Sequence, residues 1–337
     1  MPIHELTLED YWRGIILRGK NSASYKFALA QSLLELKPQS GQLIQLGDIA
    51  PTFAKHLTQH LKGSDKQGAA KSSKFLNICR DYNAGKLTDN ELVDATIRHG
   101  FVNVIDAFHV VGKSDIPKRF YEDERKANNG IRITDEFSEL LEREQASNLP
   151  FEVESRWRLV ETAWELNISH QLISMDYDLE SGSLFTTVDK QRRKAITSAR
   201  PALNGYQKGK CFYCNCDIHL DDEVHENPDV DHFFPHTLKQ YGFVGIDGIW
   251  NLVLSCQSCN RGSGGKFDSV PKEHLLKRLH TRNEHLISSH HPLRETLILQ
   301  TGKNEQARKS YLNDYYNNAH KTIIHTWEPE EKHEKLF

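Results

Sequence analysis

Residues 211–262 read CFYCNCDIHLDDEVHENPDVDHFFPHTLKQYGFVGIDGIWNLVLSCQSCNRG, and this stretch decides the fold of the second half of the chain. Two Cys-x-x-Cys pairs stand at its ends. Thiolates paired in this way suit tetrahedral Zn²⁺, and a closed set of four leaves no open coordination position. We therefore expect a structural zinc that ties distant parts of the chain together and contributes to folding. The predicted ligands are Cys211, Cys214, Cys256 and Cys259.

The gap between the two pairs is longer than the roughly 15–20 residues of a plain zinc ribbon, so the sequence predicts an insertion there. Cys216 could replace Cys214 as a ligand. The two-residue spacing favours Cys214, which leaves Cys216 as a spare thiol. The sixth cysteine, Cys79, follows Phe75, Leu76 and Ile78 and is expected to be a buried small side chain, not a reactive thiol.

The insertion carries polar residues that suit a second, catalytic metal. Mg²⁺ takes oxygen ligands and keeps waters, so Asp231 can hold it, while a neutral His232 can remove a proton from water near pH 7. Asn251 and Asn260 offer amide oxygens downstream, and the zinc would fix the direction of Asn260, which follows Cys259 directly. An Asp-His pair alone is more often an ordinary surface or core pair. The ordered set of all four residues predicts the catalytic site.

This ordered set resembles the HNH, or ββα-metal, nuclease family with a four-cysteine zinc staple. The matching motifs are Asp231-His232 followed by Pro235, Asn251-Leu252, and Cys259-Asn260-Arg261. The resemblance implies that Asp231 and Asn260 bind the catalytic Mg²⁺ or Mn²⁺, that His232 is the general base, and that Asn251 orients His232. The third signature position holds Asn instead of His, a variant found in the family. The resemblance covers roughly residues 190–282 and leaves the first half of the chain unexplained.

The net charge of −3 excludes a polycation that would coat nucleic acid indiscriminately, so any nucleic-acid surface must be local. Two basic stretches flank an acidic segment, residues 217–231, and suit a phosphate-binding rim around a metal site. Arg261 and Lys266 are candidate phosphate anchors, and a solvated cation is the alternative for each. The basic residues are Lys190, Arg192, Arg193, Lys194, Arg200, Lys208 and Lys210, then Arg261, Lys266, Lys272, Lys277, Arg278 and Arg282.

The length of 337 residues suggests two domains, since a domain typically has roughly 150 residues. Apolar residues at helical spacing predict helices near 25–36, 46–63, 137–141 and 157–164, and again beyond His274. Thr88-x-x-Glu91 is a capping-box pattern. Short apolar runs predict strands at 102–111 and 131–133. The expected fold is α+β: a mainly helical regulatory or partner-binding domain (1–185), an HNH nuclease domain (186–282) and a helical C-terminal extension (283–337).

The predicted function is that of a hydrolase, a metal-dependent endonuclease that cleaves DNA, in bacterial defence against foreign DNA or as the nuclease subunit of a larger complex. The alternatives are a catalytically degenerate zinc-stapled nucleic-acid-binding module and a nuclease directed at RNA. The N-terminal half is expected to contact a protein partner, because it lacks a clustered basic stripe. Without an apolar run of about 18 residues or a secretory signal, no membrane association is expected, and the predicted location is cytoplasmic.

Overall fold

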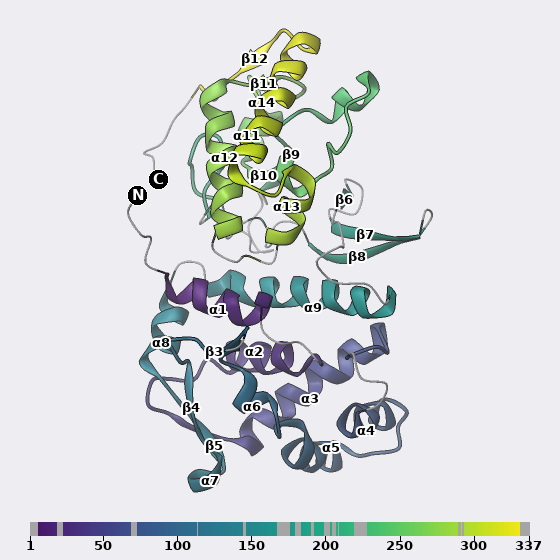
Figure 1. The fold of residues 1–337 in the computed structure, drawn as a ribbon, viewed down its shortest axis with the longest axis vertical. Coiled ribbons are helices and arrows are strands. Elements are labelled where there is room, and N and C mark those ends of the chain that lie inside the picture. The colour runs from purple at the N-terminus through teal and green to yellow at the C-terminus, as the bar shows by residue number, and fades with distance from the viewer. Residues whose placement is uncertain are drawn as a thin grey trace. The chain divides into compact units, whose positions relative to one another are not determined.

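The computed structural model of the chain divides into two compact units (Figure 1). Residues 1–170 and 289–292 form the first unit, and residues 171–288 and 293–337 form the second. Both units combine helices with small sheets. The predicted domain boundary at residue 185 lies inside the second unit. Most of the predicted C-terminal extension, residues 283–337, belongs to the second unit as well. The structure describes residues 6–18, 23–68, 73–112, 114–143, 146–166, 176–178, 183–189, 192–198, 203, 207, 209–218, 228–288, 291 and 293–330.

Helices dominate the first unit, and their ends follow local chemistry. The predicted capping box is confirmed: Thr88 accepts from the Glu91 N–H, and the Glu91 carboxylate accepts from Thr88. Cys79 is fully buried, as expected, and burial raises its pKa to about 12. The helices are α1 (Leu8–Arg18), α2 (Tyr25–Leu36), α3 (Leu46–Gly63), α4 (Lys74–Asn83), α5 (Asp89–Ala95) with the π-turn η1 (Thr96–Gly100), α6 (Val104–Ala107), α7 (Arg125–Asn128), α8 (Asp135–Glu142), η2 (Ala146–Asn148) and α9 (Leu149–Leu166).

The strand predicted at 102–111 was wrong for most of its length. Residues Val104–Ala107 form α6, and only Val110–Val111 form a strand, β2, which pairs with β3 (Ser114–Asp115). Val104, Ile105 and Phe108 are all buried in the core of the first unit. A spacing of one and then three residues puts these side chains on one face of a helix, and a strand would have divided them between two faces.

The strand predicted at 131–133 is confirmed as β5 (Gly130–Ile133), the centre of an antiparallel sheet between β1 (Leu43–Gln45) and β4 (Tyr121–Glu124). Gly130 is required at the start of β5, because a Cβ atom there would lie 2.2 Å from the carbonyl oxygen of Ile44. No added methyl group could be tolerated at that distance from the backbone.

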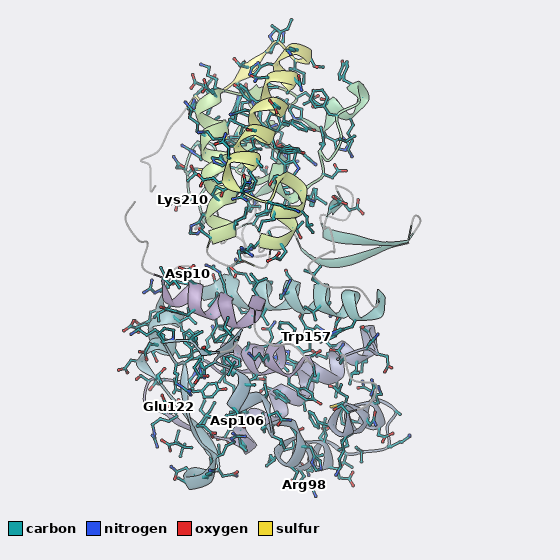
Figure 2. All side chains as sticks on the ribbon, in the orientation of Figure 1. Asp10, Arg98, Asp106, Glu122, Trp157 and Lys210 are labelled. Carbon is teal, nitrogen blue, oxygen red and sulfur yellow. The ribbon has the colours of Figure 1, made fainter. Side chains whose placement is uncertain are left out.

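A buried polar network holds α3 against α9 in the first unit. Trp157 is a residue of α9 (Figure 2). The His60 ring stacks on it with ring centroids 3.5 Å apart. Its Nδ1 lies 2.6 Å from Glu161 and its Nε2 lies 2.9 Å from Glu154. Burial alone would lower the pKa of His60, but these two carboxylates raise it above 6.5. The folded protein therefore favours the imidazolium form of His60.

This network predicts a pH-dependent stability. Because the pKa of His60 is raised on folding, its contribution is fully present below the unfolded value of about 6.5 and is lost as the pH rises through the folded value. We expect the free energy of unfolding, measured by urea titration with tryptophan fluorescence, to fall as the pH rises from about 6. His60→Gln should reduce that fall, whereas His56→Gln, one helical turn earlier, should not. Equal pH dependence in wild type and His60→Gln would contradict the assignment.

The second unit contains two short strands, β9 (Asp229–His232) and β10 (Leu252–Ser255), which pair in antiparallel orientation and are followed by α11 (Gln257–Arg261). Helices α12 (Glu273–Ser288), α13 (Arg294–Thr301) and α14 (Glu305–Thr322) complete it, as the sequence predicted beyond His274. A second sheet contains β6 (Asp176–Asp178), β7 (Ser183–Asp189) and β8 (Arg192–Ser198), and β11 (Val270–Pro271) pairs in parallel with β12 (Thr326–Trp327). The turns η4 (His236–Tyr241) and η5 (Ile249–Asn251) connect β9 to β10.

Trp250 and Phe234 pack with Tyr315 of α14, so the residues that precede β10 and follow β9 share one aromatic core. This packing fixes both ends of the connection that runs from His232, the last residue of β9, to Asn251, the residue before β10. Among the described residues, no helix has both the length and the apolar character needed to cross a membrane.

Candidate functional site

Four thiols form a cluster at one end of β10. The sulfur atoms of Cys211, Cys214, Cys216 and Cys256 lie within 4.8 Å of one another, and those of Cys214 and Cys256 are 3.8 Å apart. Sulfurs placed tetrahedrally at about 2.3 Å from zinc are separated by about 3.8 Å. The cluster therefore has the donor atoms and the spacing for a metal ion such as Zn²⁺.

Cys259, the fourth predicted ligand, also contacts this cluster. Its thiol interacts with those of Cys211, Cys214 and Cys256, and its N–H donates to the Cys256 sulfur over 3.5 Å. Five thiols therefore surround a site that has four positions for a tetrahedral metal. One set of four ligands is the cluster with Cys216, and the other is the predicted set with Cys259. Cys211, Cys214 and Cys256 belong to both sets.

The backbone of the first cysteine pair explains why Cys216 lies in the cluster, where the sequence predicted a spare thiol. Asn215 adopts the left-handed conformation, with φ of 65°, which asparagine tolerates better than most residues. This turn brings the chain back, so that the Cys216 carbonyl accepts from the Cys211 N–H at 2.8 Å. An Asn directly before the third cysteine is the sequence signal that could have indicated this turn.

Asp231 is directly connected to the cysteine turn. Its Oδ2 accepts a 2.6 Å hydrogen bond from the Tyr213 hydroxyl, and its Oδ1 lies 3.3 Å from the Lys266 ammonium. Both Asp231 and Lys266 are almost completely buried. Burial raises the pKa of Asp231, while Lys266 and Tyr213 act in the opposite direction. Lys266 is thus an internal partner of the carboxylate, a role that the sequence did not predict.

The neighbouring residue, His232, is held by a carboxylate from the loop before β10. Its Nε2 lies 3.3 Å from Asp247, and its ring packs edge-on against Tyr177. Lys239 also contacts Asp247. Burial alone would raise the pKa of Asp247, but the hydrogen bonds from His232 and Lys239 lower it to about 2. Asp247 is therefore negatively charged at neutral pH and fixes the ring of His232, a contact that the sequence analysis missed.

Asn251 is completely buried and uses its amide on the backbone. Its Oδ1 accepts from the Phe234 N–H at 2.8 Å, and its Nδ2 donates to the carbonyls of Phe234 and Ile246. Both N–H donors of the amide are occupied by these two bonds. The Asn251 side chain thus holds the backbone of Phe234, two residues after His232. Any effect of Asn251 on the orientation of the His232 imidazole passes through this backbone.

Asn260 lies at the end of α11 beside β9. Its Nδ2 donates to Asp229 at 3.0 Å, and the same carboxylate oxygen lies 3.0 Å from the Arg261 Nε. Because the amide nitrogen is directed at Asp229, the Oδ1 of Asn260 is the atom that remains for a cation. Asp229 and Asp231 are two residues apart on one strand, so their side chains share a face. Asp229 is a second residue that the sequence analysis missed.

A pocket of about 250 Å³ brings most of the predicted residues together, and Asn251 is not among the residues that line it. Oxygen donors of this kind suit Mg²⁺ or Mn²⁺. Each oxygen of Asp231 has one hydrogen-bonding or ionic partner and keeps lone-pair capacity for a metal, and Asn260 offers its Oδ1. These oxygens are the donors that could hold a divalent cation, in competition with the Lys266 ammonium beside Asp231. The lining includes Asp231, His232, Asn260, Arg261, Lys266 and Phe267.

Several of the predicted basic residues have structural roles. Arg278 donates to the carbonyls of Phe212 and Tyr213 in the cysteine turn, and the buried Arg282 donates to carbonyls before and within β10. Lys210 pairs with Asp217 at 2.5 Å. Arg261, by contrast, keeps its side chain 59% exposed at the pocket. The side chains of Lys190, Arg192, Arg193, Lys194, Arg200 and Lys208 lie outside the described residues.

The chain matches no protein-family model, no curated protein and no solved structure.

Proposed function

We propose that the second unit is a metal-dependent phosphodiesterase of the HNH type. The observation that carries this proposal is that Asp231, His232 and Asn260 line one pocket, which is connected to the thiol cluster through Tyr213 and α11. The antiparallel β9–β10 pair followed by α11 supports a ββα-metal arrangement. Zinc at the cysteines would be structural, and reduced thiols favour a cytoplasmic location.

In the proposed mechanism, His232 is the general base. Because Asp247 faces its Nε2, the Nδ1 is the nitrogen that accepts a proton from the attacking water. The water oxygen forms a bond to phosphorus, the bond to the leaving oxygen breaks, and that oxygen takes a proton from solvent. Asp247 keeps the ring oriented and stabilises the imidazolium. A divalent cation held by Asp231 and Asn260 would supply charge that stabilises the phosphate and leaving oxygens.

DNA is the proposed substrate, and defence against foreign DNA is the proposed biological setting. The first unit has its own core, which supports a separate regulatory or partner-binding role for it. One observation favours a non-catalytic nucleic-acid-binding module instead. The Lys266 ammonium already neutralises Asp231, as a lysine would in a site that has lost its metal.

Incubation with plasmid DNA and with single-stranded RNA distinguishes these functions. We expect cleavage with Mg²⁺ or Mn²⁺ and none in EDTA. Because EDTA also removes zinc, a chelated sample should be supplied with Zn²⁺ alone and then with Zn²⁺ and Mg²⁺, and only the second addition should restore cleavage. Binding without cleavage under every metal condition would support the degenerate module, and cleavage of RNA alone would support the RNA-directed alternative.

The role of Asp229 gives a sharper test of the metal site. Asp229→Asn removes the charge that directs the Asn260 amide and pairs with Arg261. Loss of such a supporting carboxylate typically weakens metal binding or activity about 10–100-fold. We therefore expect the Mn²⁺ concentration for half-maximal cleavage to rise by about that factor. Asp268→Asn, an exposed aspartate on the same pocket, is the matched control. An unchanged Mn²⁺ requirement in Asp229→Asn would remove Asp229 from the site.

A further inference from the structure

Phe267 is an unusual lining residue of the pocket. Phe267 is 58% exposed, while the preceding residue, Lys266, is buried. An aromatic ring in this setting presents a flat apolar surface to solvent beside the predicted catalytic residues His232 and Asn260. Packing within the protein does not account for the choice of phenylalanine here.

The backbone at Phe267 is also unusual. Its φ of 42° lies in the left-handed region, where a bulky residue is a genuine outlier. The same loop contains Gly262, Gly264 and Gly265, yet a phenylalanine occupies this position. Strain of this kind persists only where the surroundings hold it, and it is concentrated at functional sites.

Hydrogen bonds fix this conformation to α11. The Phe267 N–H donates to the Asn260 carbonyl at 3.0 Å, and the Phe267 carbonyl accepts from the Lys266 ammonium at 3.1 Å. The Lys266 N–H donates to the Cys259 carbonyl at 2.7 Å. The ring is therefore attached to a backbone that is anchored beside the thiol cluster. A partner that contacts the ring need not order this loop first.

From these observations we propose that Phe267 stacks on an unpaired nucleobase adjacent to the cleaved phosphate. The inference rests on the proposed function and deepens it. Every base has a π-face that can stack on an aromatic side chain, and Arg261 at the same pocket offers a cation for the neighbouring phosphate. In a duplex these faces are covered by the adjacent bases, and exposing one costs unpairing and unstacking energy. The preferred substrate is therefore single-stranded or locally unpaired.

Binding of short labelled oligonucleotides, followed by fluorescence anisotropy in Ca²⁺ with His232→Ala protein, tests this proposal. Adding Phe267→Ala should weaken single-strand binding by about 5- to 150-fold, equivalent to about 1–3 kcal/mol, and leave duplex binding unchanged. Phe267→Trp, which keeps an aromatic ring at this position, should bind single strands as tightly as the protein with Phe267. Parallel single-stranded DNA and RNA show which nucleic acid supplies the base. Phe151→Ala, an exposed phenylalanine in the first unit, is the matched control.

Phe267→Gly separates stacking from folding, because glycine accepts the left-handed backbone without strain. It should melt at no lower temperature than wild type and should lose the same single-strand affinity. Unchanged affinity in Phe267→Ala, or an equal loss for single strands and duplex, would overturn the stacking role. If wild type and Phe267→Ala both cleave with the same single-strand preference, only this inference fails. If no metal condition gives cleavage, the proposed nuclease function fails, while the binding comparison still decides the role of Phe267.

Discussion

Cys211→Ser is expected to abolish zinc binding and to unfold the second unit. Cys211 belongs to both sets of four ligands, and its thiol contacts those of all four other cysteines, so its loss removes the neighbour that they share. Structural zinc contributes about 10–16 kcal/mol of apparent binding free energy in small zinc-dependent folds. That is of the same size as the whole stability of a typical domain, about 5–15 kcal/mol. The zinc content of the purified protein and its thermal melting curve give the measurement.

The matched control is Cys79→Ser, the same substitution at a fully buried thiol of the first unit. Burying a hydroxyl there should cost only about 1–3 kcal/mol and leave the zinc content at one ion per chain. Asp231→Ala is a poor comparison, because it would leave the buried Lys266 ammonium without its carboxylate. Asp231→Asn is preferable. Similar melting of Cys211→Ser and Asp231→Asn, both with full zinc content, would contradict a structural zinc.

Cys216→Ser and Cys259→Ser then identify the fourth ligand. Only the substitution that removes a true ligand should lower the zinc content and the melting temperature sharply. If both single variants keep zinc and only the double variant loses it, the two thiols share the position. If even the double variant keeps zinc, the cluster does not bind it through four sulfurs.

The second large effect is expected for His232→Ala, which should lower the cleavage rate by about 10²–10⁴-fold, the usual contribution of a general base. The fold should survive, because Asp247 keeps Lys239 as a partner after the imidazole is removed. Single-turnover cleavage at saturating Mg²⁺ gives the rate, and the melting temperature reports the fold. His236→Ala is the control, since His236 lies 3.6 Å from the same carboxylate but is about half exposed.

Asp247→Asn extends this test without removing the base. If Asp247 orients the ring of His232 and stabilises its imidazolium form, the variant should lower the cleavage rate while leaving substrate binding unchanged. Wild-type cleavage by a folded His232→Ala protein would remove the imidazole from the mechanism. Wild-type cleavage by Asp247→Asn alone would remove only the positioning role.

Local patterns in the sequence were sufficient for much of the fold. Helices α2 and α3 and the Thr88 cap were predicted because apolar spacing and capping bonds act within a few residues. The same local reasoning failed at 102–111, where a short apolar run suits either a strand or a buried helix and only the surrounding core decides.

The sequence by itself also determined which residue types could form the site, through the two cysteine pairs and the order Asp231, His232, Asn260. Tertiary structure alone decided their partners. It placed Cys216 in the thiol cluster, directed Asp247 at His232, and buried Lys266 against Asp231. The physical reason is that charge pairing and metal geometry depend on distances of a few ångströms between segments far apart in the chain. No local periodicity encodes such distances, because they are fixed only when the strands and helices pack together.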